Sequence, residues 1–447
     1  MKALYIFVSL FFLTLFYSCQ DDLNFNNNSD ESLSLKSISL NSKCVKDGVK
    51  IAILSDIHVM DPSLLMKDGP AFQAYLAQDP KLLELSLKIL QATVNKIIAQ
   101  KPDLVLIPGD LTKDGEIISH ITVSNVLRQL TKHGIKVLVT MGNHDVNNPE
   151  SVLYFKSTTF PYPSIQADRI PFIYSNFGFN NAISRDPNSL SYVNEPIKDL
   201  WVITIDANKY YQNTTKSIVG GVIKPETMRW VKEQLAIALS KGKTVIGMMH
   251  HGLIEHFNGQ EQIDPGYVVD DSESSAEELM NAGMKIILTG HYHANDITKK
   301  EYNGKFIFDV ETGSTVAYPC TYRMLTITGN KYSFESQNTT NLMGPGFDLY
   351  AKTFLSEHLD GYFTYLLTNL YSVPANYAQT FAPYFKAAAM AHFAGDEVMP
   401  PDLIDQINYL NAVDKSGTLS MVLGTLWTDI NTPDNNVTID METGVAQ

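Results

Sequence analysis

Short continuous runs of apolar residues recur through most of the chain, and longer stretches with helical spacing separate them. The runs cover residues 51–54, 104–107, 136–140, 201–205, 244–249 and 285–289. Runs of this length are typical of strands that are buried on both faces. Amphipathic stretches, which predict helices, cover residues 81–100, about 117–133, 225–240 and 274–283. The alternation predicts an α/β fold with a mixed, largely parallel sheet that helices cover on both faces.

The pattern changes after about Gly344, where it becomes purely helical. Four amphipathic helices with aromatic faces are predicted over residues 347–371, 377–393, 401–412 and 419–430. We therefore expect a helical C-terminal domain over residues 341–447. Capping a functional site, mediating association and simple packing are all compatible with this pattern.

The N-terminus is typical of a targeting segment. Met1-Lys2 precedes an apolar run over residues 4–17, which is too short to span a bilayer comfortably, and Ser18-Cys19 follows. A small residue before a lone cysteine resembles a bacterial lipoprotein signal, although Phe16 and Tyr17 leave ordinary secretion or an uncleaved anchor as alternatives. We expect a signal peptide over 1–19, a flexible tether over 20–45 and an exported lipoprotein, periplasmic or at the cell surface. Its membrane attachment would be a lipid on Cys19.

Two further cysteines, Cys44 and Cys320, follow Cys19. An oxidising compartment permits a disulfide between them, and two separate buried thiols are an equal alternative. The composition is that of a globular protein, with 44% hydrophobic and 18% charged residues. A formal net charge of -14 argues against binding a nucleic-acid polymer, which requires clustered Lys and Arg. A small anionic substrate remains possible, because bound metal ions can reverse the local field. No feature of the sequence indicates an oligomeric state.

Metal-preferring side chains follow the ends of the predicted strands. They are Asp56, His58, Asp110, Asn143, His144, Asp145, His250, His291 and His293. Ligands of such folds bind at the carboxyl ends of the strands, and two residues two apart on an extended backbone, such as Asp56 and His58, point the same way. Carboxylates, an amide and several imidazoles suit Mn, Fe, Zn, Ni or Co better than Ca or Mg. The pattern predicts a hydrolytic site that holds two divalent transition-metal ions.

The order Asp-x-His, Gly-Asp, Gly-Asn-His-Asp, His, Gly-His-x-His resembles the calcineurin-like metallophosphoesterase family over about residues 49–336. Residues 109–116 and 142–149 also resemble a bacterial branch described as cyclic-nucleotide phosphodiesterase-like. The resemblance implies an αββα sandwich as the catalytic domain, for which we take residues 46–340. It also implies a small phosphoester as substrate.

The family pattern implies a role for each motif residue. One ion would be held by Asp56, His58 and His293, and the other by Asn143, His250 and His291, with Asp110 shared by both. A hydroxide between the ions would attack phosphorus. His144 would stabilise the developing charge or protonate the leaving oxygen, and Asp145 would orient His144.

Lys113 narrows the type of site. Purple acid phosphatases have a tyrosine three residues after the shared aspartate, and this chain has Lys113 there, so we expect a colourless site. The expected reaction is hydrolysis of phosphodiesters similar to cyclic nucleotides. The alternatives are a phosphomonoesterase or nucleotidase and a phosphodiesterase acting on lipid headgroups. A binding lipoprotein with an inactive site is disfavoured, because every expected ligand is present.

Overall fold

The computed structural model describes residues 46, 48–395, 397–414, 416–428 and 432–447. The expected signal peptide and tether, with Cys19 and Cys44, lie outside these residues. The pairing of Cys44 with Cys320 therefore stays a prediction; the Cys320 side chain is buried. No helix within the described residues has both the length and the apolar character that crossing a membrane requires.

One sheet contains three parallel strands that carry the first site motifs. β1 (Val49–Ile53) pairs with β2 (Leu104–Ile107), and β2 pairs with β3 (Lys136–Val139). On the other side of β1 the sheet continues with antiparallel strands, in the order β13 (Thr321–Thr328), β14 (Lys331–Asn338), β15 (Asn436–Asp440) and β16 (Val445–Ala446). The predicted apolar runs in this sheet are therefore its three parallel strands, of which β3 lies at the edge.

A second sheet carries the remaining motifs. Its strands follow the order β11 (Ile297–Tyr302), β12 (Lys305–Glu311), β10 (Ile286–Thr289), β9 (Thr244–Met249), β8 (Leu200–Ile205), β7 (Tyr192–Ile197) and β6 (Ser184–Arg185). The strands from β12 to β8 are parallel, and the outer pairs are antiparallel. Parallel pairing thus occupies one end of the first sheet and the middle of the second, and the site motifs follow these parallel strands.

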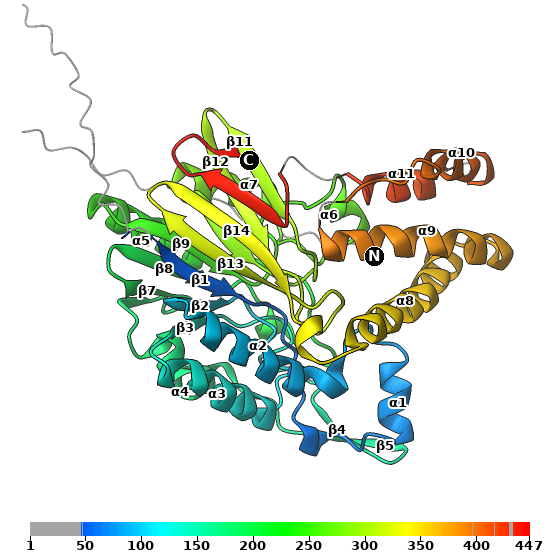
Figure 1. Ribbon diagram of the computed structural model, residues 1–447, viewed down its shortest axis with the longest axis horizontal. Helices are drawn as coiled ribbons and strands as arrows, with labels where there is room; N and C mark the ends of the chain where they lie inside the picture. The colour runs from blue at the N-terminus through cyan, green and yellow to red at the C-terminus, as the bar shows by residue number, and fades with distance from the viewer. Residues whose placement is uncertain (1–45, 47, 396, 415, 429–431) are drawn as a thin grey trace, which may run out of the picture. The chain divides into compact units, whose positions relative to one another are not determined.

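The two sheets pack face to face between layers of helices (Figure 1). One continuous apolar cluster joins strand residues of both sheets, such as Leu106 and Leu288. Helices α2 (Ser86–Gln100) and α3 (Ile117–Lys132) cover the first sheet, and α5 (Pro225–Ser240) and α7 (Ser272–Asn281) cover the second. This arrangement confirms the predicted α/β sandwich.

Shorter elements fill the connections. Helix α1 (Pro70–Leu76) packs against the hairpin of β4 (Val152–Phe155) and β5 (Thr158–Pro161) through a small apolar cluster. The remaining short helices are α4 (Ile170–Ile173) and α6 (Gln260–Ile263).

Four further helices lie together at one side of the sandwich (Figure 1). They are α8 (Phe347–Tyr365), α9 (Ala375–Ala394), α10 (Leu403–Val413) and α11 (Thr418–Thr425). Their apolar faces meet in a cluster of their own, which includes Phe363, Phe381 and Phe385. The predicted helices are therefore present.

The end of the chain differs from the helical region expected through residue 447. After α11 the chain returns to the first sheet, where β15 pairs with β14 and Phe334 lies opposite Val437. Val437 and Ile439 are buried, whereas Asn436 is exposed. A strand this short, with only two inward apolar residues, gives a weak sequence signal. The helices are consequently inserted between two neighbouring strands of one sheet.

Candidate metal centre

The predicted site residues lie in the loops directly after β1, β2, β3, β9 and β10. Five of them adopt left-handed backbone conformations, with φ of 51° at Asp56, 36° at His58, 47° at Asp110, 81° at His291 and 66° at His293. The extended backbone expected from Asp56 to His58 is therefore wrong. Each left-handed residue other than glycine costs about 1–3 kcal/mol, and such strain concentrates at functional sites.

Contacts between loops hold these conformations in place. The Asp56 amide donates to the Gly109 carbonyl at 3.2 Å, and the His58 amide donates to the Asp110 carbonyl at 2.9 Å. Gly142 is required at its position, because a Cβ there would collide with Oδ1 of Asp110. The backbone thus brings the loops from β1, β2 and β3 within contact of one another.

Asp56, His58 and His293 form the first group of converging side chains. Nε2 of His58 lies 3.1 Å from Nε2 of His293 and 3.7 Å from Oδ1 of Asp56. Oδ1 of Asp56 lies 3.4 Å from Nε2 of His293. These atoms lie as close together as ligands of one ion would.

Asn143, His250 and His291 converge beside the first group. Nε2 of His250 lies 3.1 Å from Oδ1 of Asn143, and His250 and His291 can share an ion with Asp110. Oδ2 of Asp110 lies 3.4 Å from Nε2 of His250 and 3.5 Å from Nε2 of His58. A single carboxylate oxygen therefore reaches both groups. The structure brings the residues together in the grouping that the resemblance implies; their role as metal ligands stays a prediction.

Hydrogen bonds on the outer side of Asp56, Asp110 and His250 fix which atom of each faces the site. Asp56 accepts bonds at Oδ2 from the Ser55 hydroxyl (2.6 Å) and the His291 amide (3.0 Å). Asp110 accepts at Oδ1 from the His144 amide at 3.0 Å. His250 Nδ1 donates to the Pro108 carbonyl at 2.9 Å. Such bonds orient metal-binding side chains and set the histidine tautomer.

Burial and neighbouring charges set the protonation of the imidazoles. Burial lowers the pKa of His58 well below its usual value, and burial together with the nearby His251 and His250 does the same to the pKa of His291. Both rings are thus neutral and keep a lone pair. Burial also opposes protonation of His250, but the Asp110 carboxylate outweighs it and raises its pKa to about 9. A bound cation would displace that proton.

His144 lies at the edge of the centre, and its orienting carboxylate is Asp114. Its Nδ1 donates to the Lys113 carbonyl at 2.6 Å and lies 3.0 Å from Oδ1 of Asp114. Burial disfavours the charged ring, but Asp110 and Asp114 together raise the pKa of His144 to about 9. With Nδ1 engaged, Nε2 remains as the nitrogen that can exchange a proton with a substrate.

Asp114 is in turn paired with Lys113. The Lys113 side chain is 1% exposed; its ammonium bonds the Asp114 carboxylate and lies 4.1 Å from the centre of the Tyr75 ring. In the sequence, Lys113 indicated only that a tyrosinate is absent, and Asp114 was not among the predicted site residues. An acidic residue four positions after Asp110, beside a lysine, was the available signal.

Asp145 does not have the predicted role of orienting His144. Its Oδ1 accepts from the Thr112 amide (2.9 Å) and hydroxyl (2.8 Å), and its Oδ2 accepts from the amides of Leu111 (3.0 Å) and Gly142 (2.9 Å). These bonds join the loops that follow β2 and β3. Asp145 therefore positions Asp110 and Asn143 through the backbone.

The donor set fits divalent transition metals. Oδ1 of Asp56 is buried and has no hydrogen-bond partner among the described residues, although two imidazole nitrogens lie within 3.7 Å of it. An unpartnered buried carboxylate oxygen is costly unless a cation or a donor satisfies it. Imidazole nitrogens with carboxylate and amide oxygens are ligands that Mn, Fe, Zn, Ni and Co accept.

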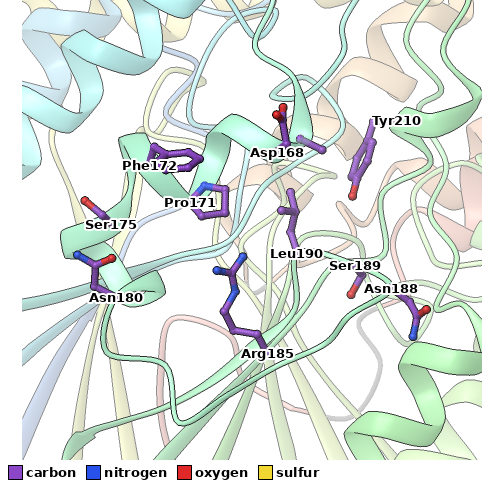
Figure 2. A pocket seen from close by; sticks show the side chains of 11 residues that line it. Asp168, Pro171, Phe172, Ser175, Asn180, Arg185, Asn188, Ser189, Leu190 and Tyr210 are labelled. Atoms are coloured by element: carbon purple, nitrogen blue, oxygen red, sulfur yellow. The ribbon is translucent and has the colours of Figure 1, made fainter.

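A second hollow, larger than the cavity beside the candidate metal centre, lies elsewhere on the surface and has no such group of converging metal-preferring side chains among its lining residues (Figure 2). It is lined by Phe172, Arg185 and Tyr210, among others, and Arg185 points into it. Of the described residues that line it, none also lines the cavity beside the candidate metal centre. The converging ligands, rather than the size of a hollow, identify the functional site.

Comparisons with known proteins identify the family of the chain. The sequence model of the family described as calcineurin-like phosphoesterase matches residues 49–295. A stretch of 68 residues is 40% identical to a probable cyclic nucleotide phosphodiesterase from Ruthia magnifica subsp. Calyptogena magnifica, and it covers 15% of this chain and 28% of that protein.

Solved structures with a related arrangement include two phosphatases. A dimetal phosphatase from Danio rerio is 13% identical, with a TM-score of 0.44, over 65% of this chain and 96% of that one. A purple acid phosphatase from yellow lupin (Lupinus luteus) is 12% identical, with a TM-score of 0.42, over 66% of this chain and 52% of that one.

Proposed function

Because the chain belongs to the calcineurin-like phosphoesterase family and is a hydrolase of phosphoester bonds, we propose that it holds two divalent transition-metal ions and cleaves phosphodiesters. The observation that carries the proposal is the position of Asp110, whose Oδ2 lies 3.5 Å from His58 and 3.4 Å from His250. One oxygen within reach of two ligand groups is the arrangement that a pair of ions requires.

Asp56, His58 and His293 would hold one ion, and Asn143, His250 and His291 the other, with Asp110 shared. When bound, the ions supply Lewis-acid polarisation of the phosphoryl group and lower the pKa of the attacking water. The site residues lie in loops that directly follow strands, and hydrogen bonds between these loops hold them more rigidly than a free loop would be held. They therefore fix where the phosphorus atom sits relative to His144.

His144 donates a proton to the leaving oxygen in this proposal. A pKa of about 9 keeps the ring protonated at neutral pH, and bound cations beside it would lower that value toward neutrality. Asp114 and the Lys113 carbonyl hold Nδ1, so that Nε2 is presented to the substrate. A positioned acid of this kind contributes about 10²–10⁴-fold to the rate.

The preference for diesters is supported by the short stretch that resembles the probable cyclic nucleotide phosphodiesterase. It can be tested with bis-p-nitrophenyl phosphate and p-nitrophenyl phosphate after loading the protein with each candidate metal. We expect faster hydrolysis of the diester. Faster hydrolysis of the monoester would favour a phosphomonoesterase or nucleotidase instead.

The site itself can be tested with Asp110→Ala. We expect this variant to be inactive, whereas Asp405→Ala, an exposed aspartate on α10, should behave like the unmodified protein. Elemental analysis should find close to two ions per active chain. Full activity of Asp110→Ala, or an active preparation with well under one ion per chain, would contradict the proposal.

We also propose that the chain acts in the cell envelope, attached through Cys19. The proposal rests on the Ser18-Cys19 motif after a short apolar run. Labelling of cells with a radioactive fatty acid should mark the full chain and should not mark Cys19→Ser. Equal labelling of both would contradict it.

A further inference from the structure

A cavity of about 460 Å³ opens directly onto the candidate metal centre. One wall contains the predicted site residues Asp110, Asn143, His144, His291 and His293. The opposite wall comes from the inserted helices α8, α9 and α11. Any substrate with its phosphorus at the centre must therefore place one of its organic groups against these helices.

The helical wall is apolar and largely aromatic. Side chains that line it include Tyr362, Phe363, Phe385, Phe393, Val422 and Leu426. Phe363, Phe385, Val422 and Leu426 are each less than 9% exposed, although they border a cavity. Sites that bind an organic group commonly combine such a wall with a few polar groups at one end.

Direct contacts fix this wall relative to the metal centre. The ring of Phe393 on α9 lies 6.5 Å from the ring of His293, measured between centroids. His358 on α8 donates from Nε2 to the Leu76 carbonyl at 2.6 Å, which joins α8 to the last residue of α1. The cavity is therefore a built part of the site.

Several polar side chains that line the cavity are already bonded within the protein. Asp264 accepts a bond from the Tyr292 hydroxyl at 3.0 Å. His358 contacts carbonyls at both ring nitrogens, and Lys81 pairs with Asp79 at 3.1 Å. Besides these occupied groups, the lining contains the hydroxyls of Tyr267, Tyr362 and Tyr371, so few polar atoms stand beside a larger number of apolar side chains to bind a nucleobase or a sugar. It offers burial of apolar surface instead.

We propose that the substrate is a phosphodiester in which one ester group is bulky and apolar, aryl or alkyl, and that this group occupies the cavity between α8, α9 and α11. The proposal rests on the proposed function, because the phosphorus atom must sit at the metal centre. The helical insertion then determines specificity by burying a part of the substrate that takes no part in the reaction.

Three diesters with the same p-nitrophenolate leaving group test this inference. The second ester group is methyl in the first diester, octyl in the second, and thymidine attached through its 5′ oxygen in the third. We expect kcat/KM for the octyl ester to exceed that for the methyl ester by about 50-fold. This corresponds to about 2.4 kcal/mol, the gain from burying about three of the additional methylenes of the octyl group in the cavity. The thymidine ester should be the poorer substrate of the two larger ones.

Two pairs of variants separate the cavity from the chemistry. Ala389→Trp fills the cavity, and Ala387→Trp places the same side chain at an exposed position of the same helix. Tyr362→Ala removes a lining ring, and Tyr365→Ala removes a ring that is 68% exposed on the same helix. Ala389→Trp should lower the ratio of kcat/KM for the octyl ester to kcat/KM for the methyl ester at least about tenfold, which corresponds to about 1.4 kcal/mol. Tyr362→Ala should lower the same octyl-to-methyl ratio, and neither control should change it.

The outcomes distinguish this inference from the proposed function. Equal kcat/KM for the methyl and octyl esters in the unmodified protein, or a preference for the thymidine ester, would contradict the inference that the cavity binds an apolar ester group. Phosphodiester hydrolysis as the proposed function would be unaffected by that result. Retention of the octyl preference in Ala389→Trp would overturn the assigned location. No hydrolysis of any of the three esters would overturn the proposed function, and the inference with it.

Discussion

Replacing Asp114 with asparagine tests the role of His144 most directly. Asp114 is buried and lies 3.0 Å from Nδ1 of His144, so Asp114→Asn keeps the shape of the contact and removes its charge. Loss of that charge lowers the pKa of His144 and weakens the hold on its ring. Removing an outer partner of this kind commonly costs 10- to 100-fold, or about 1.4–2.7 kcal/mol.

The size of the loss should depend on the leaving group. Phenolate needs protonation as it leaves, whereas p-nitrophenolate leaves readily without it. We expect kcat for a methyl phenyl phosphodiester to fall about 10- to 100-fold in Asp114→Asn, and kcat for the p-nitrophenyl counterpart to fall less than about threefold. His144→Asn should show the same selectivity with a larger loss.

Stability must be separated from catalysis in this experiment. Asp114→Asn leaves the buried Lys113 ammonium without its closest carboxylate, and breaking a buried ion pair costs about 3–5 kcal/mol. The double variant Lys113→Met/Asp114→Asn removes both charges and should recover most of that free energy of unfolding in urea denaturation. Equal losses of kcat for the two leaving groups in the folded double variant would refute the assignment of His144 as the acid.

Three further predictions concern the metal centre, the last strand and a buried ion pair. Asp110→Asn should bind about one ion fewer in equilibrium dialysis with Mn²⁺ and lose at least about 100-fold in kcat/KM; two tightly bound ions would contradict the shared ligand. Ile439 in β15 is fully buried, so Ile439→Ala should lower the free energy of unfolding by about 2–4 kcal/mol. Val445 is 48% exposed, so Val445→Ala should lower it by less than about 0.5 kcal/mol. Equal effects of the two variants would contradict the observed pairing of β15. Burial disfavours charge on His256, but Glu311 at 2.6 Å and Asp296 at 3.3 Å raise its pKa well above 6.5. The contribution of the His256 ion pair to the free energy of unfolding is therefore complete below pH 6.5, and it is lost as pH rises through the pKa of His256 in the folded protein. Urea denaturation should show stability falling toward alkaline pH, and His256→Gln should flatten that fall; an unchanged profile in the variant would contradict the assignment.

The parallel strands that carry the site motifs could be predicted because each is a continuous apolar run. The candidate ligands could be predicted because they lie beside those runs in the sequence, as Asp110 does beside Ile107. Both signals are local, so no knowledge of the tertiary structure was needed to find them.

Features that depend on distant contacts could not be predicted in the same way. Asp145 and Asp114 are neighbours of other motif residues, and only the fold decides that the first bonds backbone amides and the second His144. The left-handed conformations of Asp56 and His58 likewise depend on carbonyls of the loop after β2. The apolar cavity requires helices and loops separated by more than a hundred residues.

The return of the chain to β14 through β15 makes the four helices an exchangeable cassette. Their entry and exit both lie at the same edge of the first sheet, where Glu335 is opposite Asn436. A short turn from β14 to β15 could replace the whole insertion and leave the strands that carry the metal ligands connected as they are. Different helical segments inserted between β14 and β15 would then direct the same catalytic centre to other organic groups. Substrate specificity and catalysis could thus be engineered separately.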